Sequence, residues 1–556
     1  MRVILDGPGR RSFSRPLRQI CADKSADVPA ALDLVRAALD DGCFVAGWLG
    51  YELGYALEPK LARFSGNGPL LRLGVFAAMD TTADVPLGRA YAGPLKLDWD
   101  FNTYAARFAQ VKDFIASGDI YQANLSLRAR FTFLGDAQAL YERLLQACDA
   151  GYCGFVDDGE RQIVSLSPEL FFDLTADGII TVRPMKGTAP REQDDDAARA
   201  RLAASPKNRA ENLMIVDLIR NDLSRIAEPG SVTVPDLFKV ETYPTLHTMV
   251  STVTAKKRSD AGVADILKAL FPCGSVTGAP KIRAMEILHD LESAPRGAYC
   301  GAVGYFAPNG EARFNVAIRT LSIQDGQGAL GLGGGVVQDS QAAAEYDECL
   351  LKARFYVTAR QPIALIETMR FENGFARLDA HLARMHRSAH ALGLAFDAQA
   401  AQRACHDAVV GMTGPLRVRL TLDEAGLHHA TAQSLPPNPD HWTYTLSPDH
   451  MPGDDALLGH KTSWRERYDA PHPGDEMIFR NQHGQLTEGS RSNIFVKRDG
   501  VLWTPPLSCG VLPGILRAEL LASGQAREAV LTADDLMGEV YFGNALRGLI
   551  RAVPYT

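Results

Sequence analysis

Along the chain, the spacing of apolar residues alternates between the period of an amphipathic helix and the period of a β-strand. Residues 104–131 begin with apolar positions at the spacing of an amphipathic helix, stop at a Gly-Asp pair, and continue as a strand. In that strand Ala123, Leu125 and Leu127 alternate with polar residues, and we expect them to face inward. Helix and strand signals mix irregularly in this way, and no short internal repeat is present.

A second amphipathic helix is predicted over residues 209–230. Leu213, Val216, Leu218 and Ile219 fall on its apolar side, and a Pro-Gly pair ends it. Before it, two strand-like runs flank the sequence Thr-Ala-Asp-Gly, which is typical of a hairpin turn. The pattern therefore predicts antiparallel strands and a helix that packs through one face.

The chain has 556 residues, which is long enough for two or more folding units. A strong helical pattern over residues 340–359 is followed by Arg-Gln-Pro and a fresh strand, and we place a boundary near residues 358–362. The predicted regions are an N-terminal part of the first unit, its catalytic region and a second unit, at residues 1–100, 101–358 and 363–556.

Composition narrows the class of protein. Hydrophobic residues make up 46% and charged residues 22%, as in an ordinary globular enzyme, and the net charge of −8 disfavours nucleic-acid binding, which needs a basic face. The sequence contains no run of about 18 apolar residues, so we expect no membrane span. The start of the chain lacks the order of a signal peptide, and the nine cysteines are scattered. These features favour a reduced, cytoplasmic protein without a membrane anchor.

Acidic residues on two predicted helices form a candidate metal site. Glu345 and Glu348 lie three residues apart, so both carboxylates can share one face, and Glu211 lies on the earlier helix. Such an oxygen-only site suits Mg²⁺ when substrate anions complete its octahedron. A solvated acidic helix face is the alternative interpretation.

Several neighbouring motifs are weak signals when taken singly. A lysine such as Lys186, in the sequence Met-Lys-Gly-Thr, is usually a surface charge, and a lone histidine such as His247 is usually structural. The glycine-rich run Gly333–Gly335 lets backbone approach a ligand, and its N–H groups can bind a carboxylate. Thr277, near a predicted helix start, can do the same.

The order of these motifs is far more specific. The chain contains SLSPEL, PMKGTAPRE, ENLMIVDLIRNDLSRIAEPGSV, LFPCGSVTGAPKIRAMEIL, RGAYCGAVGYF and AEYDECLLKA, in that order. This series resembles the chorismate-utilising enzymes, strongly over residues 121–352 and loosely over residues 1–100. The resemblance implies an α+β fold with two large antiparallel sheets flanked by helices, and a Mg²⁺-bound chorismate.

The resemblance also implies roles for individual residues. Glu211 and Glu348 correspond to metal ligands with Glu345 in support, whereas Asn208 departs from the acidic residue usual there. Glu169 corresponds to the acid that protonates the leaving 4-hydroxyl group. The residues that correspond to further substrate contacts are Gln122, His247, Thr277, Tyr299, Arg319, Gly333, Gly334 and Gly335. For Arg319 this agrees with its chemistry, since a guanidinium can clamp a carboxylate bidentately.

Two positions choose among the reactions of the family. The water-using relatives carry a lysine base where this chain has Gln122, and the anthranilate-forming relatives carry a small residue where it has Lys186. An amine in the C2 pocket can attack C2 of chorismate, after which ammonia enters at C4. The resemblance thus implies amination at C4. The alternative is anthranilate formation, with amination at C2.

A second set of motifs lies in the C-terminal region. Lys461 in Gly-His-Lys-Thr can form a Schiff base, and Glu488 in Leu-Thr-Glu-Gly can keep a pyridinium nitrogen protonated. The turn that contains Leu512 and Gly514 enters a predicted helix and suits a phosphate. Over residues 363–556 these motifs resemble the fold-type IV pyridoxal phosphate enzymes.

That second resemblance adds a phosphate-binding role for Arg384 and implies a smaller α+β unit. The fold-type IV group includes aminotransferases and pyruvate-eliminating lyases. Together the two units imply amination of chorismate followed by pyruvate elimination to 4-aminobenzoate, a folate precursor. The chain has no amidotransferase nucleophile motif, so ammonia is expected from a separate glutamine amidotransferase subunit or from solution. A transaminase, or a silent unit kept for homodimer formation or docking, is the alternative for the C-terminal region.

Overall fold

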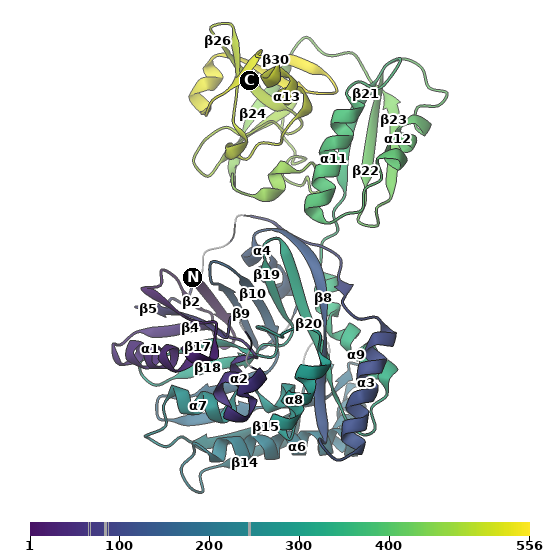
Figure 1. The fold of residues 1–556 in the computed structure, drawn as a ribbon. Helices are drawn as coiled ribbons and strands as arrows, with labels where there is room; N and C mark the ends of the chain where they lie inside the picture. The colour runs from purple at the N-terminus through teal and green to yellow at the C-terminus, as the bar shows by residue number, and fades with distance from the viewer. Residues whose placement is uncertain are drawn as a thin grey trace. The chain divides into compact units, whose positions relative to one another are not determined.

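The computed structural model describes residues 1–64, 66, 68–82, 86, 88–148, 150–242 and 246–555. These residues form two compact units (Figure 1). The first unit comprises residues 1–85, 95–131 and 141–359, and the second comprises residues 86–94, 132–140 and 360–556. The second unit therefore includes two short segments from the first third of the sequence.

Two large sheets with antiparallel strand pairs form the first unit, which confirms that part of the α+β prediction. In spatial order, one sheet contains β16 (Gly278–Ala279), β8 (Gln122–Gly135), β20 (Gln327–Val336), β19 (Thr320–Gln324), β10 (Gln162–Ser167), β9 (Tyr152–Asp157), β1 (Arg2–Asp6) and β2 (Arg11–Phe13), with β7 (Lys96–Leu97) beside β8. The last residues of β8 belong to the second unit, where β6 (Ala90–Ala92) pairs with them. The other contains β13 (Met185–Pro190), β15 (Leu246–Lys256), β12 (Ile179–Arg183), β11 (Leu170–Leu174), β18 (Ala312–Val316), β17 (Ala302–Phe306), β4 (Phe44–Leu49), β5 (Leu71–Phe76) and β3 (Arg18–Ala22), with β14 (Thr233–Thr242) beside β15.

Helices cover these sheets and carry several of the predicted site residues. They are α1 (Val28–Asp40), α2 (Leu53–Leu57), α3 (Phe101–Ala116), α4 (Ala137–Ala147), α5 (Asp195–Ala204), α6 (Pro206–Ser224), α7 (Val263–Leu270), α8 (Lys281–Leu291), α9 (Ala342–Lys352) and α10 (Arg354–Ala359). α6 packs on β13 and β15, and α9 packs on β20. The two helices that carry the candidate metal ligands are thus each anchored to a sheet.

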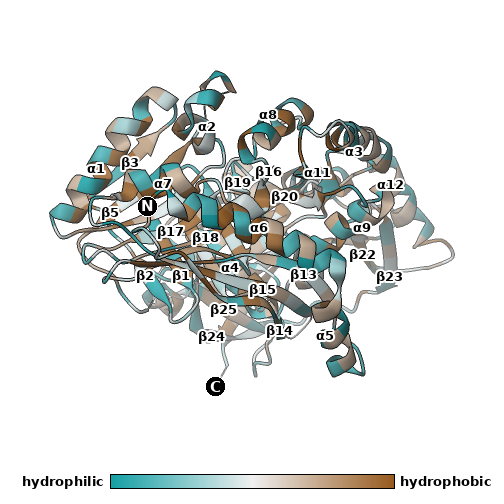
Figure 2. Cartoon of the chain, turned by 90° about the horizontal axis from the view of Figure 1, so that it is seen from below, coloured by the Kyte–Doolittle hydropathy of each residue, from teal (hydrophilic) through white to brown (hydrophobic). Residues whose placement is uncertain are grey.

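The apolar side of α6 differs from the prediction at one position. Val216 and Ile219 are buried as expected, but Leu213 is 44% exposed. Asn212 takes the buried place instead, because its side-chain carbonyl accepts a hydrogen bond from Ser251 Oγ at 2.6 Å. The alternation of polar and apolar residues along α6 is visible in Figure 2. Among the described residues, no helix is both long enough and apolar enough to span a membrane.

The second unit contains a small sheet and a larger mixed sheet. The small sheet is formed by β21 (Leu365–Phe371), β22 (Leu416–Leu422) and β23 (His428–Ser434), beside α11 (Leu378–Leu392) and α12 (Ala398–Asp407). The larger sheet is formed by β25 (Glu476–Asn481), β24 (Trp442–Met451), β30 (Gly548–Pro554), β29 (Glu539–Asn544), β26 (Asn493–Arg498), β27 (Val501–Thr504) and β28 (Ala526–Glu528), with α13 (Ile515–Ala522) packed on β28 and β29. Here β24 pairs in parallel with its two neighbours.

Candidate functional site

Lys186, on β13, lies beside the glycine-rich part of β20 and the start of β8. A Cβ built on Gly335 would lie 3.3 Å from Lys186 Nζ and 2.7 Å from Gln122 Nε2. Gln122 is 1% exposed, and both polar atoms of its amide lack a hydrogen-bond partner among the described residues. Buried amides are normally paired, so this unpaired one indicates a place for a polar ligand. Glycine at position 335 keeps that place open.

The amine of Lys186 is shifted toward its neutral form. Burial lowers the pKa of Lys186, and the positive charge of Lys352 lowers it further, whereas Glu169, Glu211 and Glu348 act in the opposite direction. A neutral amine is the nucleophilic form of lysine. The lowered pKa is compatible with a nucleophilic role for Lys186, which stays a prediction.

Glu169 is a buried acid of the same cluster. Burial raises the pKa of Glu169 to about 7, although a hydrogen bond from Ser275 and the charge of Lys186 oppose the shift. The side chain is 4% exposed, and Oε1 has no hydrogen-bond partner in the described part of the chain. A carboxyl group with such a pKa can donate a proton near neutral pH.

Glu345 and Glu348 of α9 lie at Gly334 of β20, and Glu211 of α6 is near enough to be affected by their charges. A Cβ on Gly334 would lie 3.2 Å from Glu345 Oε2 and 3.8 Å from Glu348 Oε1. Burial raises the pKa of Glu211; the positive charges of Lys186 and Lys207 oppose this shift, and the negative charges of Glu345 and Glu348 add to it. Since a cation would relieve this crowding of like charges, the donor set fits Mg²⁺.

The carboxylates do not form a complete metal site without further ligands. In the ranges that the structure describes, no three His, Cys, Asp or Glu side chains are arranged to hold a metal ion by themselves. Mg²⁺ usually takes only one or two carboxylates and completes its octahedron with waters and substrate oxygens. In Glu345, Oε1 accepts a 2.7 Å hydrogen bond from Ser340, and Oε2 lies toward Gly334.

Lys352 is a site residue that the sequence analysis missed. Its Nζ lies 2.7 Å from Glu348 Oε1 and donates a 2.8 Å hydrogen bond to the carbonyl of Gly333. The i,i+4 spacing of Glu348 and Lys352 on one helix was an available signal. The lysine offsets part of the negative charge: burial alone would raise the pKa of Glu348, but Lys352 lowers it below its ordinary value.

Tyr299 packs against Gly331 and Gly333 of β20, and Thr277 follows the 3₁₀ helix Gly274–Val276. A Cβ on Gly333 would lie 3.0 Å from the hydroxyl of Tyr299, and one on Gly331 would collide with the ring. The hydroxyl of Thr277 donates to the carbonyl of Gly274 at 3.2 Å. Tyr299 thus borders the backbone that lines the cluster, and the hydroxyl of Thr277 is occupied locally.

Arg319 and His247 make contacts apart from this cluster. Arg319 has φ +49° and donates weakly to Cys148 Sγ at 3.9 Å. The fully buried His247 interacts through Nδ1 with Thr242 Oγ1 at 3.0 Å and through Nε2 with Asp195 Oδ1 at 3.1 Å. Their substrate roles stay predictions, and the contacts of His247 also fit a structural residue.

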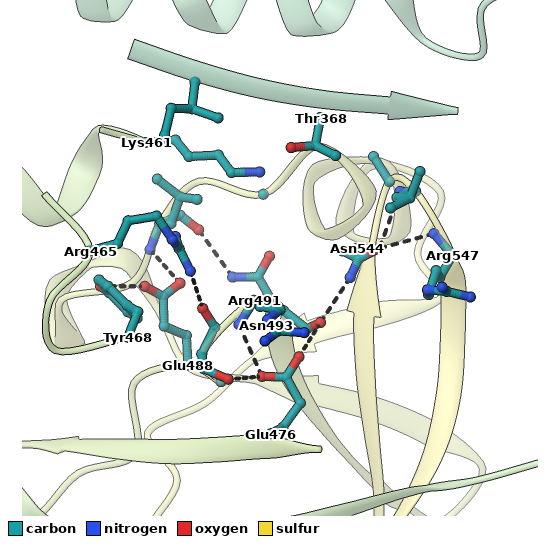
Figure 3. Close-up of a pocket in the computed structure, with 18 of the residues that line it drawn as sticks. Thr368, Lys461, Arg465, Tyr468, Glu476, Glu488, Arg491, Asn493, Asn544 and Arg547 are labelled. Atoms are coloured by element: carbon teal, nitrogen blue, oxygen red, sulfur yellow. Dashed lines mark hydrogen bonds between the residues drawn. The ribbon is translucent and has the colours of Figure 1, made fainter. Parts of the chain in front are cut away.

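A cavity of about 480 Å³ in the second unit brings together the residues predicted to hold a cofactor (Figure 3). Its wall includes Arg384, Lys461, Glu488, Leu512 and Gly514. The Lys461 amine points into the cavity in Figure 3. Burial lowers the pKa of Lys461 to about 8, with a smaller contribution from the charge of Arg384.

Glu488 is held at the cavity wall by two donors. Tyr468 donates its hydroxyl to Oε1 at 2.9 Å, and the Leu512 N–H donates to Oε2 at 3.1 Å. Burial raises the pKa of Glu488 to about 7 despite these hydrogen bonds. A carboxyl group with this pKa can share a proton with a ring nitrogen of comparable basicity, as the predicted role requires.

The start of α13 offers a cradle for an anion. Gly514 is the residue before the helix, and any side chain there would collide with Asn493 Oδ1. Glycine is therefore required, and it leaves the backbone N–H groups at the helix start accessible to a ligand. Arg384 Nη1 donates to the adjacent carbonyl of Pro513 at 3.1 Å, and Glu367 holds its Nε and Nη2 at 2.8 and 2.6 Å. The N–H groups of the first turn of α13 are thus the donors that would take the phosphate of pyridoxal phosphate. The phosphate contact of Arg384 stays a prediction, because Glu367 and Pro513 hold its guanidinium.

Sequence reasoning missed several residues of this cavity. Glu476 is 1% exposed and accepts hydrogen bonds from Ser490 Oγ, Ser492 Oγ and the Arg491 N–H at 2.7, 2.8 and 2.9 Å. It thus shapes the loop after Glu488. The wall also carries the arginines Arg417, Arg419, Arg465, Arg491 and Arg547. Their positive charge suits an anionic ligand.

Comparison with known proteins agrees with both resemblances. Residues 364–553 match the family of class IV amino-transferases. Aminodeoxychorismate synthase component 1 of Klebsiella aerogenes is 44% identical over 292 residues, which is 52% of this chain and 64% of that protein. The protein of the same name from Escherichia coli strain K12 is 46% identical over 333 residues, with coverages of 54% and 73%. The chain thus spans less than two thirds of the Klebsiella relative.

A solved structure supports the fold of the first unit. Anthranilate synthase component I from Streptococcus pneumoniae TIGR4 superposes with a TM-score of 0.54 at 24% identity, covering 64% of this chain and 92% of that one. This likeness concerns the fold alone. Residues 80–358, half of the chain, match the chorismate binding enzyme family, so the chain belongs to that family.

Proposed function

We propose that the chain aminates chorismate at C4 to 4-amino-4-deoxychorismate and then eliminates pyruvate to give 4-aminobenzoate, a folate precursor. The carrying observation is Lys186, an amine with a lowered pKa beside the unpaired amide of Gln122 and the buried acid Glu169. The names of the Klebsiella and Escherichia relatives support the first reaction. The class IV amino-transferase match supports the second.

In the first reaction Lys186 acts as a nucleophile. Its nitrogen forms a bond to C2 of chorismate while the bond from C4 to the hydroxyl breaks, and Glu169 gives that hydroxyl a proton so that it leaves as water. Ammonia then bonds to C4, and Lys186 leaves C2. The sum is chorismate plus ammonia to 4-amino-4-deoxychorismate plus water.

Mg²⁺ is proposed to be held by Glu211, Glu345 and Glu348, where it would supply positive charge for a substrate carboxylate. Glu348→Gln and Glu211→Gln are each expected to weaken Mg²⁺ affinity about tenfold or more, since a carboxamide offers a hard cation less charge. Calorimetric titration of Mg²⁺ in the presence of chorismate measures this. Unchanged affinity in both variants would leave the carboxylates as a solvated helix face.

In the second reaction the chain holds pyridoxal phosphate through Lys461, Glu488 and the backbone around Gly514, and Arg384 supports that backbone. The bound cofactor supplies an electron sink for the pair released when a substrate C–H bond breaks. Lys461 takes the C4 proton, and Glu488 keeps the ring nitrogen protonated. The pyruvate enol ether at C3 then leaves. The arginine-rich wall suits a substrate with two carboxylates.

One incubation tests the whole proposal. The purified chain is mixed with chorismate, Mg²⁺, ammonia and pyridoxal phosphate, and the products are identified by mass spectrometry and chromatography. We expect 4-aminobenzoate and pyruvate. Formation of 2-aminobenzoate would identify the chain as an anthranilate synthase instead, and accumulation of 4-amino-4-deoxychorismate would indicate a silent or transaminating second unit.

The nitrogen source gives a separate prediction. The sequence carries no amidotransferase nucleophile motif, and the relatives are named as component 1, so we propose a separate glutamine amidotransferase partner. Ammonium at alkaline pH is expected to support turnover by the pure chain, whereas glutamine alone is not. Comparable rates with glutamine and ammonium would contradict this, and glutamine with an added amidotransferase subunit is the positive control.

The pH dependence follows from Glu169. Because its pKa is raised to about 7, the protonated form is present below that pH and is lost above it. The rate per free ammonia is therefore expected to fall as the pH rises beyond about 7. The variant Glu169→Gln cannot titrate and should lack this descending limb. If the rate of Glu169→Gln still falls above about pH 7, the fall is caused by another titrating group.

A further inference from the structure

Two short segments from the first third of the sequence belong to the second unit. They are residues 86–94 and 132–140, named the insert segments here, and their strands pair antiparallel. Tyr91 is fully buried, and its ring meets the ring of Trp464 edge-on with centroids 6.3 Å apart. Through Tyr91 the insert segments therefore contribute to the core of the second unit.

Arg89 of the insert segments makes two polar contacts. Its Nη1 donates to the carbonyl of Trp464 at 3.0 Å, and its Nε lies 3.5 Å from Asp455 Oδ2. The Asp455 side chain is 0% exposed. A buried carboxylate is costly unless it is paired, so Arg89 matters for where Asp455 can lie.

These two contacts lie on either side of Lys461. The other oxygen of Asp455 accepts a 2.9 Å backbone hydrogen bond at the start of the 3₁₀ helix Ala456–Gly459, which ends two residues before the lysine. Trp464 follows the lysine by three residues. Arg89 also lies on the wall of the cavity into which the amine points. One guanidinium thus contacts the lysine-bearing segment at both ends, through a hydrogen bond to Trp464 and an ion pair with Asp455 that is too long for a hydrogen bond.

We infer that Arg89 is a positioning residue for Lys461, so that the second unit depends on residues outside its class IV amino-transferase match. An arginine suits this task because its planar fork carries several donors, whereas lysine offers one point charge. The contacts of Arg89 with the segment that carries Lys461 are present without any bound ligand. Only their catalytic consequence rests on the proposed role of Lys461.

The test uses the full-length chain and two measurements. Hydrogen exchange with mass spectrometry follows a peptide over residues 455–466, and peptide mapping after borohydride treatment with pyridoxal phosphate follows labelling of Lys461 against pH. The variants are Arg89→Ala, Arg89→Lys and Asp455→Asn. The matched control is Arg130→Ala, which breaks an arginine–aspartate pair of 2.8 Å with Asp98 on a neighbouring strand pair.

Arg89→Ala is expected to speed exchange of residues 455–466 about tenfold and to shift the pH midpoint of labelling. Arg89→Lys should fall between it and the wild type, and the control should match the wild type. A peptide over residues 539–552 should not change in any variant. Exchange in Arg89→Ala equal to that of the control, or equally faster in both peptides, would overturn the inference. Absence of label on wild-type Lys461 would instead refute the proposed function, and the exchange measurement would still decide the positioning.

Discussion

Replacing Lys186 by alanine is expected to reduce formation of 4-amino-4-deoxychorismate by roughly 10³-fold or more, as for other enzymes that lose a covalent nucleophile. The loss has a geometric reason, because Lys186 Nζ lies against Gly335 and beside the unpaired amide of Gln122. Lys352 also acts on Glu169, but its amine is paired with Glu348 at 2.7 Å. Ammonia could then reach C2 in the vacated pocket, so residual activity is expected to shift toward 2-aminobenzoate.

The measurement is product analysis after incubation with chorismate, Mg²⁺ and ammonia. Lys268→Ala, which removes an exposed lysine near the end of α7, is the matched control and should keep the wild-type rate. Thermal unfolding of both variants checks that the fold is intact. If Lys186→Ala makes 4-amino-4-deoxychorismate at the wild-type rate, the covalent role is wrong, whatever the product of the second unit.

The sequence predicted the elements and motif residues whose information is local. The hairpin around Thr-Ala-Asp-Gly and the helices that carry Glu211 and Glu348 have clear periodicity, and the structure contains them. The prediction that Leu213 is buried was wrong. Periodicity ranks positions by hydrophobicity and cannot show that a polar residue such as Asn212 has a buried hydrogen-bond partner. Asn212 is buried only because Ser251, 39 residues later, supplies a hydrogen bond.

Residues that act through distant neighbours were harder to predict. Tyr468 and Glu476 show no local signal for a site, since their roles come from Glu488 and the loop of residues 489–493. Arg89 is the extreme case, because its partners Asp455 and Trp464 lie more than 360 residues away in the sequence. Only a folded chain reveals such contacts.

Lys461→Ala is expected to lose both the covalent link to pyridoxal phosphate and the release of pyruvate, while 4-amino-4-deoxychorismate still accumulates. The reason is that one amine performs two tasks. Its pKa, lowered to about 8 by burial, leaves a useful neutral fraction near that pH, and that form can bond to the cofactor and accept the C4 proton. Aromatisation of the ring then makes pyruvate loss hard to reverse.

The lyase and the transaminase interpretations separate at this residue. A lyase returns no proton to the cofactor and needs no keto acid, so pyruvate should form in equal amount to 4-aminobenzoate. Borohydride trapping with peptide mapping should place the label on Lys461, whereas Lys497→Ala, an exposed lysine of β26, should behave as the wild type. A label on a different lysine, or 4-aminobenzoate formed at the normal rate by Lys461→Ala, would overturn the assignment. A keto product that needs an added amino acceptor would identify a transaminase.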